Sequence, residues 1–551
     1  MRHFQKAVAL TVMLYSIAAS MAAQTLGACT DQGMWSSEQF IITQGTTQYP
    51  INISVPLLLT DGRVMVQNTT TWAGLGLNAY QDWFTLTPST TTNGTCASGS
   101  YTCGTWSAPG GIKSLQTILG GAYAPLGFGS AVLADGKLII EGGEFNGGQN
   151  VWTNMGAIYD PFQNSWTAVN PPTGWSNIGD AMSAVLPNKT FMLGHVWPPT
   201  ESDSALLTES SLTWTETGLN KQEQNNEETW TLLPGMNGGV LTVDAHCVGY
   251  PSCNPNYPDN SEVYSPASGT WSSVGSTQEP LYNRSSAEIG PAVLQNDGTV
   301  LALGTAYGDG NLPAYAAVYN PSSPLGQQWT LIGQLPTIGS KYMGSGDQPA
   351  VLLPDGNVMF EVDNANWLNG DQGSSPTPYF FEWTGFSGGF CQLTGPSNGT
   401  PSQSILLMLP TRQIFVTSAF NNVSNGNYWI YTPGGSASVT NAPKITSVAS
   451  TLSRGSTYLI SGMRFNGMSQ DSSYGDDFQN ATNYPLVKIV NNASGDTFYA
   501  RTHDHSTMAV STALSPVYTH FDVPSNAETG ASNLYVIVNG IPSTPIGVTI
   551  Q

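Results

Sequence analysis

The protein is a chain of 551 residues in which 36 acidic side chains outnumber 15 basic ones, giving a formal net charge of −21 at pH 7. A surface of this sign repels the phosphates of nucleic acids and anionic lipids, so neither is an expected partner. With 60 glycines, 36 prolines and only 9% charged residues, the composition favours an exported all-β protein.

The first residues have the pattern of a secretory signal peptide. A basic segment, Met1–Lys6, precedes an apolar run over residues 7–19 that is too short to span a bilayer comfortably. Small residues follow at Ser20, Ala22 and Ala23, so we expect a signal peptide over residues 1–23. No later stretch is long and apolar enough for a membrane span, and the expected location is extracellular or at the cell surface.

From about residue 45 to 440 the chain repeats a hydrophobic strand, a tight turn and a second hydrophobic strand. The clearest copy runs from Gln348 to Phe360 around Asp355-Gly356, a dipeptide that accepts the positive φ angles of a hairpin turn. Each copy has a marker leucine before its turn, and the intervals between markers are 47 to 74 residues. The seven markers are Leu59, Leu133, Leu186, Leu233, Leu294, Leu353 and Leu409.

Most copies continue with an aromatic strand, a turn and a tryptophan, as in Val263 to Trp271 and Val318 to Trp329. Two hairpins per repeat make a four-stranded blade, and the period is near that of kelch repeats. The sequence therefore predicts an all-β fold with a seven-bladed kelch-type β-propeller over residues 24–442. A run of unrelated hairpins is the alternative.

The repeat stops after Pro433, and a different pattern of short strands begins near Ala442. Strand-like runs over residues 486–490, 498–500 and 534–538 alternate with turn residues at the spacing of a sandwich. Residues 443–551 are predicted to form an immunoglobulin-like β-sandwich packed on the propeller.

Six cysteines in a secreted chain of this length predict a few disulfides. Two pairs, Cys96 with Cys103 and Cys247 with Cys253, each bracket a short loop and are better explained as local disulfides than as metal sites. Cys29 and Cys391 remain, and their pairing would tie the N-terminal segment to a late blade.

A secreted kelch propeller followed by this sandwich, with the closing stretch Asn539–Ser543, resembles the galactose oxidase and glyoxal oxidase family over nearly the whole chain. The resemblance implies a site at the propeller mouth, where the inner strands begin. Active members of that family hold copper there with two tyrosines, two histidines and a cysteine cross-linked to one tyrosine, and they oxidise primary alcohols or aldehydes.

The copper residues of the family are not matched in this chain. Ser402-Gln403 stands where the family has a Tyr-His pair, and the stretch Tyr474 to Gln479 lacks the later histidine. Gly127-Phe128-Gly129 has no cysteine for the cross-link. Because a tetragonal copper site needs imidazole or thiolate donors as well as oxygen, no copper-radical centre is expected at these positions. A copper-radical oxidase with a displaced site is kept as an alternative.

An acidic position recurs at the start of the inner strands, six residues before the marker leucine. Four consecutive repeats carry an acid there, and residues at one shared position form a ring around the axis of a propeller. A one-residue bulge would substitute Glu228 for Glu227. The ligand-binding candidates are Asp180, Glu227, Glu228, Glu288, Asp347 and Gln403. Crowded carboxylates raise one another's pKa or recruit a cation, so calcium is a possible cofactor. Alternatively, each acid binds the backbone of the neighbouring blade.

Two weaker metal candidates lie elsewhere. His503-Asp504-His505 could place two imidazoles on one face of a strand, although a structural pairing with Asp504 is commoner. The oxygen-rich stretch Asp363 to Asp371 could hold Ca²⁺, but it lacks the spacing of an EF-hand.

Three functions remain open from the sequence. The first is a propeller without copper that binds an extracellular glycan or a small polyol at its acidic mouth. The second is a carbohydrate-active enzyme that uses paired carboxylates or a cation in the same ring. The third is a structural protein of the cell surface or matrix, with the propeller as a spacer.

Overall fold

The computed structural model describes residues 27–196, 202–218, 221, 225, 227–243, 260–283, 286–306, 312–364, 377–400, 402–419, 425–475 and 478–551. The described residues are strands, turns and four short 3-10 helices, without an α-helix, which confirms the all-β fold class. None of the described helices is long and apolar enough to cross a membrane. The predicted signal peptide, residues 1–23, lies outside the described residues.

The described repeat strands pair into seven antiparallel sets of four. In chain order the sets are β4 (Ile53–Leu58), β5 (Val64–Asn68), β6 (Trp83–Thr87), β7 (Thr105–Trp106); β9 (Gly129–Val132), β10 (Leu138–Glu141), β13 (Gly156–Asp160), β14 (Ser165–Val169); β15 (Ser183–Val185), β16 (Phe191–Gly194), β17 (Ser204–Thr208), β18 (Thr213–Glu216); β19 (Thr229–Leu232), β20 (Val240–Val243), β21 (Asn260–Ser265), β22 (Thr270–Ser276); β23 (Ala292–Leu294), β24 (Val300–Leu303), β25 (Tyr315–Tyr319), β26 (Trp329–Gln334); β29 (Ala350–Leu352), β30 (Val358–Asn364), β31 (Tyr379–Trp383), β32 (Phe390–Leu393); and β33 (Ser404–Met408), β34 (Ile414–Ser418), β35 (Asn427–Thr432), β1 (Met34–Gln39).

The remaining short elements of this region decorate the sets. They are β2 (Ile41–Gln44), β3 (Thr47–Pro50), β8 (Pro125–Leu126), β11 (Phe145–Asn146), β12 (Gln149–Asn150), β27 (Thr337–Ile338), β28 (Lys341–Gly344), and the 3-10 helices η1 (Ala73–Leu75), η2 (Leu115–Thr117), η3 (Leu119–Gly121) and η4 (Val439–Asn441).

The repeated sequence phrase forms the first hairpin of each set. In β29 and β30 the turn is closed by the Gly356 amide, which donates to the Leu353 carbonyl at 2.9 Å, while the Asn357 amide donates to Asp355 Oδ1 at 3.0 Å. Gly356 has a φ of 104°, a conformation that glycine adopts without steric cost. The aromatic signature pairs rings across the second hairpin, as in Tyr319 and Trp329, whose centroids lie 5.2 Å apart.

The first strands of the sets contact one another in chain order. β9 contacts β15, β15 contacts β19, β19 contacts β23, β23 contacts β29, β29 contacts β33, and β33 returns to β4. The first strands therefore lie side by side at the inside of the array, and the seven-bladed propeller stays a prediction.

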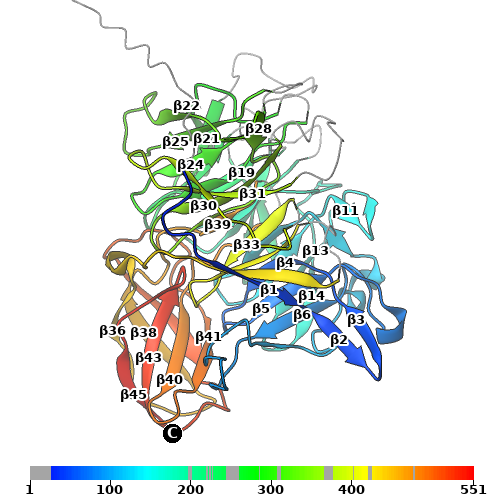
Figure 1. Cartoon of the computed structure of the whole chain (residues 1–551), viewed down its shortest axis with the longest axis vertical. Coiled ribbons are helices and arrows are strands. Elements are labelled where there is room, and N and C mark those ends of the chain that lie inside the picture. Colours follow the sequence, from blue (N-terminus) through cyan, green and yellow to red (C-terminus); the bar gives the residue numbers. More distant parts are fainter. Residues whose placement is uncertain are drawn as a thin grey trace, which may run out of the picture.

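The N-terminal strand supplies the outermost strand of the last set. β1 pairs with β35 from Met34 opposite Thr432 to Gln39 opposite Asn427, and Figure 1 shows the blue strand beside the yellow ones. The predicted Cys29–Cys391 disulfide is present and ties this segment to β32, and the predicted Cys96–Cys103 disulfide is also present. The predicted pair Cys247 and Cys253 lies outside the described residues.

From Lys444 onward the strands form a second unit, coloured orange to red in Figure 1. Its sheet runs β36-β38-β42-β41-β40-β43-β45-β37 around a buried apolar cluster that includes Ile460, Val487 and Leu534. The predicted division between residues 442 and 443 falls one residue before β36 and stays a prediction. Its strands are β36 (Lys444–Ser447), β37 (Thr451–Leu452), β38 (Thr457–Met463), β39 (Ser472–Ser473), β40 (Leu486–Asn491), β41 (Thr497–His503), β42 (Pro516–Asp522), β43 (Gly530–Val538), β44 (Ile541–Pro542) and β45 (Ile546–Ile550).

The C-terminal unit packs on the turn ends of the first hairpins. The Thr502 amide donates to the Thr60 carbonyl at 3.1 Å, and the Gly235 amide donates to the Val510 carbonyl at 2.9 Å. One segment of the unit also enters the ring, because β39 pairs with β29. The starts of the first strands therefore lie at the end of the ring away from the C-terminal unit.

Candidate functional site

We call the residues directly before the first strands the mouth, and a left-handed backbone residue recurs there. Six of the seven described sets have one: Gly127 (φ 64°), Gly179 (φ 77°), Glu227 (φ 55°), Ala287 (φ 71°), Asp347 (φ 52°) and Gln403 (φ 60°). A non-glycine residue in this conformation costs on the order of 1 kcal/mol and persists only where the surrounding structure holds it. The repeat therefore bends the chain in the same way at each of these six strand starts.

Asp347 lies at the centre of the polar contacts of the mouth. Its Oδ2 accepts a hydrogen bond from Gln403 Nε2 at 3.0 Å, and its side chain also hydrogen-bonds with that of Glu288. Burial raises the pKa of Asp347, and these two hydrogen bonds offset part of the rise. Asp347 and Glu288 come from adjacent sets, so this contact joins two of the predicted acids.

A third acid, Asp363, lies beside this pair. It is 4% exposed, and its Oδ2 accepts hydrogen bonds from Gln348 Nε2 at 2.9 Å and from Ser402 Oγ at 2.7 Å. Burial raises its pKa to about 7, the Ser402 hydrogen bond opposes that rise, and the charge of Asp347 adds to it. Gln348 Oε1 accepts from the Gln403 amide at 3.0 Å, which links the two networks.

Asp180 and Glu144 come from the opposite side of the ring and interact with Asp347. Burial raises the pKa of Asp180 to about 7, and the charge of Asp347 contributes to the rise. Burial also raises the pKa of Glu144 to about 8, with further contributions from Asp180 and Asp347. Glu144 belongs to the second set, Asp180 to the third and Asp347 to the sixth, so these interactions join sets that are not adjacent.

The two remaining predicted acids differ in their surroundings. Glu227 is half-buried in the left-handed position of the fourth set. Glu228 is fully buried in an ion pair with Lys221, and its Oε2 also accepts from Thr242 Oγ1 at 2.7 Å. The charge of Glu228 is therefore neutralised within the fold, which is a structural arrangement rather than an open ligand position.

The residues that the resemblance placed at the copper positions make other contacts in the structure. Ser402 donates to Asp363 and Gln403 donates to Asp347, as described above. Gln479 Oε1 accepts from Ser183 Oγ at 2.8 Å, and the Gly127 carbonyl accepts from the Glu144 amide at 2.8 Å. Hydroxyl, amide and carbonyl groups already engaged in hydrogen bonds do not fit the nitrogen- or sulfur-containing donor set of a tetragonal copper site.

The segment that enters the ring contacts first strands on several sides of it. Ser473 Oγ lies 3.1 Å from Thr229 Oγ1, and the Phe478 amide donates to the Phe128 carbonyl at 3.2 Å. The ring of Phe478 packs edge-on against Tyr474 at 5.2 Å between centroids. The described residues of the stretch Tyr474 to Gln479 thus lie against the first strands of the ring.

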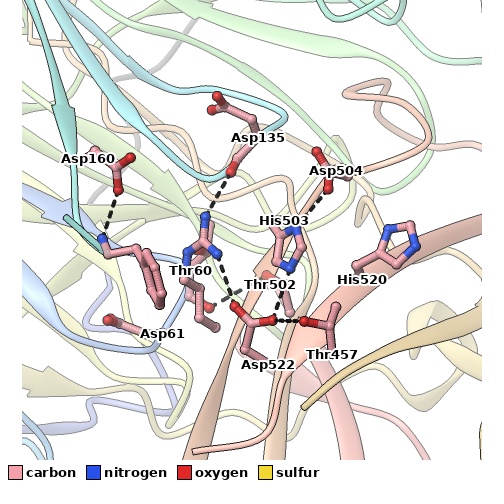
Figure 2. Close-up of polar contacts among 12 residues, drawn as sticks. Thr60, Asp61, Asp135, Asp160, Thr457, Thr502, His503, Asp504, His520 and Asp522 are labelled. Carbon is pink, nitrogen blue, oxygen red and sulfur yellow. Dashed lines mark hydrogen bonds and ion pairs between the residues drawn. The ribbon is translucent and has the colours of Figure 1, made fainter. Parts of the chain in front are cut away.

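The two histidines of the predicted His-x-His motif lie in different surroundings. Figure 2 shows His503 between two carboxylates, with its Nδ1 2.7 Å from Asp504 Oδ2 and its Nε2 3.2 Å from Asp522 Oδ1. His505 is 1% exposed, and its Nδ1 lies 2.9 Å from Thr519 Oγ1. Burial lowers the pKa of His505 to about 3. These contacts favour structural roles where the C-terminal unit meets the propeller.

Few side chains in the described part of the chain lie close enough together to bind one metal ion. There, the one group of three cysteine, histidine or acidic side chains whose ligand atoms lie within 4.8 Å of one another consists of Cys29, Glu382 and Cys391. The two cysteines form a disulfide, so they offer no thiolate. The stretch Asp363 to Asp371 is a predicted calcium candidate, and its residues after Asn364 lie outside the described residues.

Sequence reasoning missed Glu144 and the role of Asp363 in this cluster. Neither lies at the position six residues before a marker leucine, because Glu144 follows the second strand of its set, β10, and Asp363 lies near the end of the second strand of its set, β30. One signal was available in the sequence. Glu144 lies 11 residues after its marker leucine and Asp363 lies 10 residues after its own, and this spacing places both near the end of a second strand, beside the mouth.

Comparisons with known proteins bear on the fold. No protein family model and no curated protein sequence matches the chain. A solved structure described as a novel fungal alcohol oxidase with catalytic diversity among the AA5 family, in complex with copper, is similar with a TM-score of 0.51 and 14% identity, covering 94% of this chain and 100% of that one. A structure of YjhT has a TM-score of 0.37 and 13% identity, covering 56% of this chain and 93% of that one. At these identities the first likeness shows a shared fold.

Proposed function

We propose that the protein is a secreted carbohydrate-binding propeller of the galactose oxidase-like type, without the copper-radical centre, whose ligand site is the acidic mouth. The carrying observation is Asp180, which is 6% exposed and whose Oδ1 has no hydrogen-bond partner among the described residues. An unsatisfied buried polar atom costs about 1 to 3 kcal/mol. A ligand hydroxyl that donates to Asp180 would remove this cost.

The chemistry of the mouth suits a polyol. Sugar hydroxyls both donate and accept hydrogen bonds, and carboxyl groups that titrate near neutrality can do either as well. The pKa of Asp180 is about 7 and that of Glu144 is about 8, so both protonation states are populated near neutral pH.

Binding is favoured over glycan cleavage by the contact between Glu288 and Asp347. Glycosidases keep their two carboxyl groups about 5 to 9.5 Å apart. A hydrogen bond brings two carboxyl oxygens to about 2.5 to 3 Å. These two acids are therefore too close for that reaction, although other pairs in the ring keep it as the second candidate.

A glycan-array screen of the purified protein, followed by calorimetric titration of the best ligand, tests the proposal. Asp347→Asn and Glu288→Gln should weaken binding about tenfold, while the free energy of unfolding at about pH 4.5 changes by less than about 1 kcal/mol. Glu216→Gln, on the exposed edge strand β18, is the matched control. If the two mouth variants lose stability and keep their affinity, the acids serve to hold the blades together and the proposal is wrong.

Elemental analysis and a peroxide assay test the copper part of the proposal. The protein should show no peroxide production from galactose or glyoxal after copper loading. Turnover with stoichiometric copper would show that other residues bind the metal.

A further inference from the structure

We propose that the protein carries N-linked glycans at four exposed asparagines and at none of three buried ones. The proposal rests on the expected secretion of the chain and does not depend on the mouth. The motif Asn-X-Ser/Thr, in which X is not proline, marks the acceptors of this modification. It occurs nine times in the chain, at Asn52, Asn68, Asn93, Asn188, Asn283, Asn398, Asn422, Asn480 and Asn492.

Burial separates these asparagines into two groups. The exposed ones lie in connections between strands and are Asn93, Asn188, Asn398 and Asn492. The buried ones, which are 3% exposed or less, are Asn68, Asn283 and Asn480. Asn52 is half-buried, and Asn422 lies outside the described residues. Because a glycan is bulky and must extend into water, only an exposed asparagine can carry one in the folded protein.

Two of the exposed motifs show that the reacting nitrogen is available. Asn188 accepts hydrogen bonds through its Oδ1, from the Thr190 amide at 3.2 Å and from Thr190 Oγ1 at 2.6 Å. Asn398 also accepts through its Oδ1, from Ser37 Oγ at 2.8 Å and from Trp429 Nε1 at 3.0 Å. Neither Nδ2 atom has a hydrogen-bond partner among the described residues. A sugar on Nδ2 therefore leaves all of these hydrogen bonds in place.

The buried motifs use the same nitrogen as a donor. Asn68 Nδ2 donates to the Thr70 carbonyl at 2.8 Å. Asn480 Nδ2 donates to the Leu406 carbonyl at 2.8 Å. A sugar on either nitrogen would replace one amide hydrogen and place a large polar group among core side chains. A chain modified there cannot reach this fold, so folded molecules should be bare at these positions.

The modification joins the side-chain amide to an oligosaccharide carried on a lipid diphosphate. A bond forms between Nδ2 and C1 of the first sugar, and the bond from C1 to the diphosphate oxygen breaks. One proton of the amide passes to solvent, and the lipid diphosphate leaves. The step is a group transfer without any change of oxidation state.

Three of the four exposed positions lie on the side of the C-terminal unit, away from the mouth. Asn188 lies in the turn between β15 and β16, next to a carbonyl that accepts from Thr507 Oγ1 at 2.7 Å. Asn492 lies in the turn between β40 and β41 of that unit. The loop of Asn93 contacts the unit through a carbonyl that accepts from the Thr497 amide at 2.8 Å. Glycans at these three positions leave the mouth open to its ligand.

Peptide mapping of the folded protein secreted by its source organism tests the proposal. Treatment with peptide N-glycosidase in heavy-oxygen water converts each glycan-bearing asparagine into an aspartate that carries the heavy isotope. We expect the label at the four exposed asparagines and no label at the three buried ones. Absence of the label from any of the four, or its presence at a buried asparagine, overturns the proposal.

Two substitutions in one motif give a second test. Thr400→Ala removes the hydroxyl that the Asn398 motif requires and leaves Asn398 itself unchanged, whereas Thr400→Ser keeps a hydroxyl there. Thr400→Ala should lose the label at Asn398 and keep it at the other three positions, and Thr400→Ser should keep all four labels. Equal labelling of Asn398 in the two variants would show that the sugar is not attached through this motif, and the proposal would be wrong.

Discussion

Asp180 shows how a single buried carboxyl group makes stability depend on pH. Its pKa is about 7 in the folded protein against 3.8 for the unperturbed group. A raised pKa means that the protonated acid favours folding below about pH 4, and that this contribution is lost as pH rises through 7. The ionised carboxylate therefore destabilises the folded protein at pH 8.

Asp180→Asn should make the protein more stable at about pH 8, by on the order of 2 to 4 kcal/mol, and change its stability little at about pH 4.5. The amide keeps the shape of the side chain and carries no charge to desolvate. Urea unfolding at both pH values measures the effect, with Glu216→Gln as the exposed control. A variant that is less stable at pH 8 would show that the carboxylate makes a favourable contact there.

The sequence was most informative where a residue occupies a repeated position. Counting back from the marker leucines led to Asp180, Glu288 and Asp347, which the structure places in the mouth. It could not show that Lys221 neutralises Glu228, because the two residues are joined by a segment without a repeat pattern and pair only in the fold. The contact of Ser402 with Asp363 was equally hidden, since 39 residues separate them.

At the scale of elements, the hairpins could be predicted from the local sequence. The segment around β39, which enters the ring, could not. Alternating strands and Asp-Gly turns predict hairpins because the turn residues accept positive φ angles. The pairing of β39 with β29 joins residues more than 100 positions apart. The short stretch Ser472-Ser473 has no apolar pattern that would predict a strand. Its position depends on the packing of the C-terminal unit against the ring.

Phe478→Ala should destabilise the protein by about 3 to 5 kcal/mol, because truncating a fully buried phenylalanine leaves a cavity. Phe478 packs against Phe128 of the ring, so the loss should also loosen the inserted segment. Chemical denaturation measures the stability, and proteolysis between the ring and the C-terminal unit reports the loosening. Phe386→Ala, which truncates a side chain that is 66% exposed, is the matched control and should cost about 0.5 kcal/mol. Equal effects of the two changes would contradict the packing described here.

At the scale of the whole molecule, several buried acids share the behaviour of Asp180. Burial raises the pKa of each to about 7 or 8: Glu144, Asp180, Glu209, Asp363, Glu382 and Asp471. Each favours the folded state below the pKa of the unfolded acid and loses that contribution as pH rises toward 8. His505 acts in the opposite sense, because its lowered pKa costs stability as pH falls from 6.5 toward 3.

The sum predicts a stability maximum in mildly acidic solution, near pH 4 to 5. The six acids increase the free energy of unfolding as pH falls from 8. His505 decreases the free energy of unfolding only when pH falls below 6.5, the pKa of an unperturbed histidine. The melting temperature should be higher at about pH 5 than at about pH 8 by about 5 °C or more. Scanning calorimetry across this range measures it. A melting temperature that is highest at pH 8 would show that the buried carboxylates are stabilised by charges outside the described contacts.

The acidic mouth should bind a carbohydrate, and a crystal structure of the protein with the tightest-binding ligand of the glycan array tests this most directly. The predicted result is ligand density in the mouth, with polar atoms of the sugar within hydrogen-bond distance of Asp180 and Asp347. The contradicting result is a mouth that stays empty while the sugar occupies another site, such as the cavity of about 620 Å³ lined by Tyr379, Gln392 and Pro396.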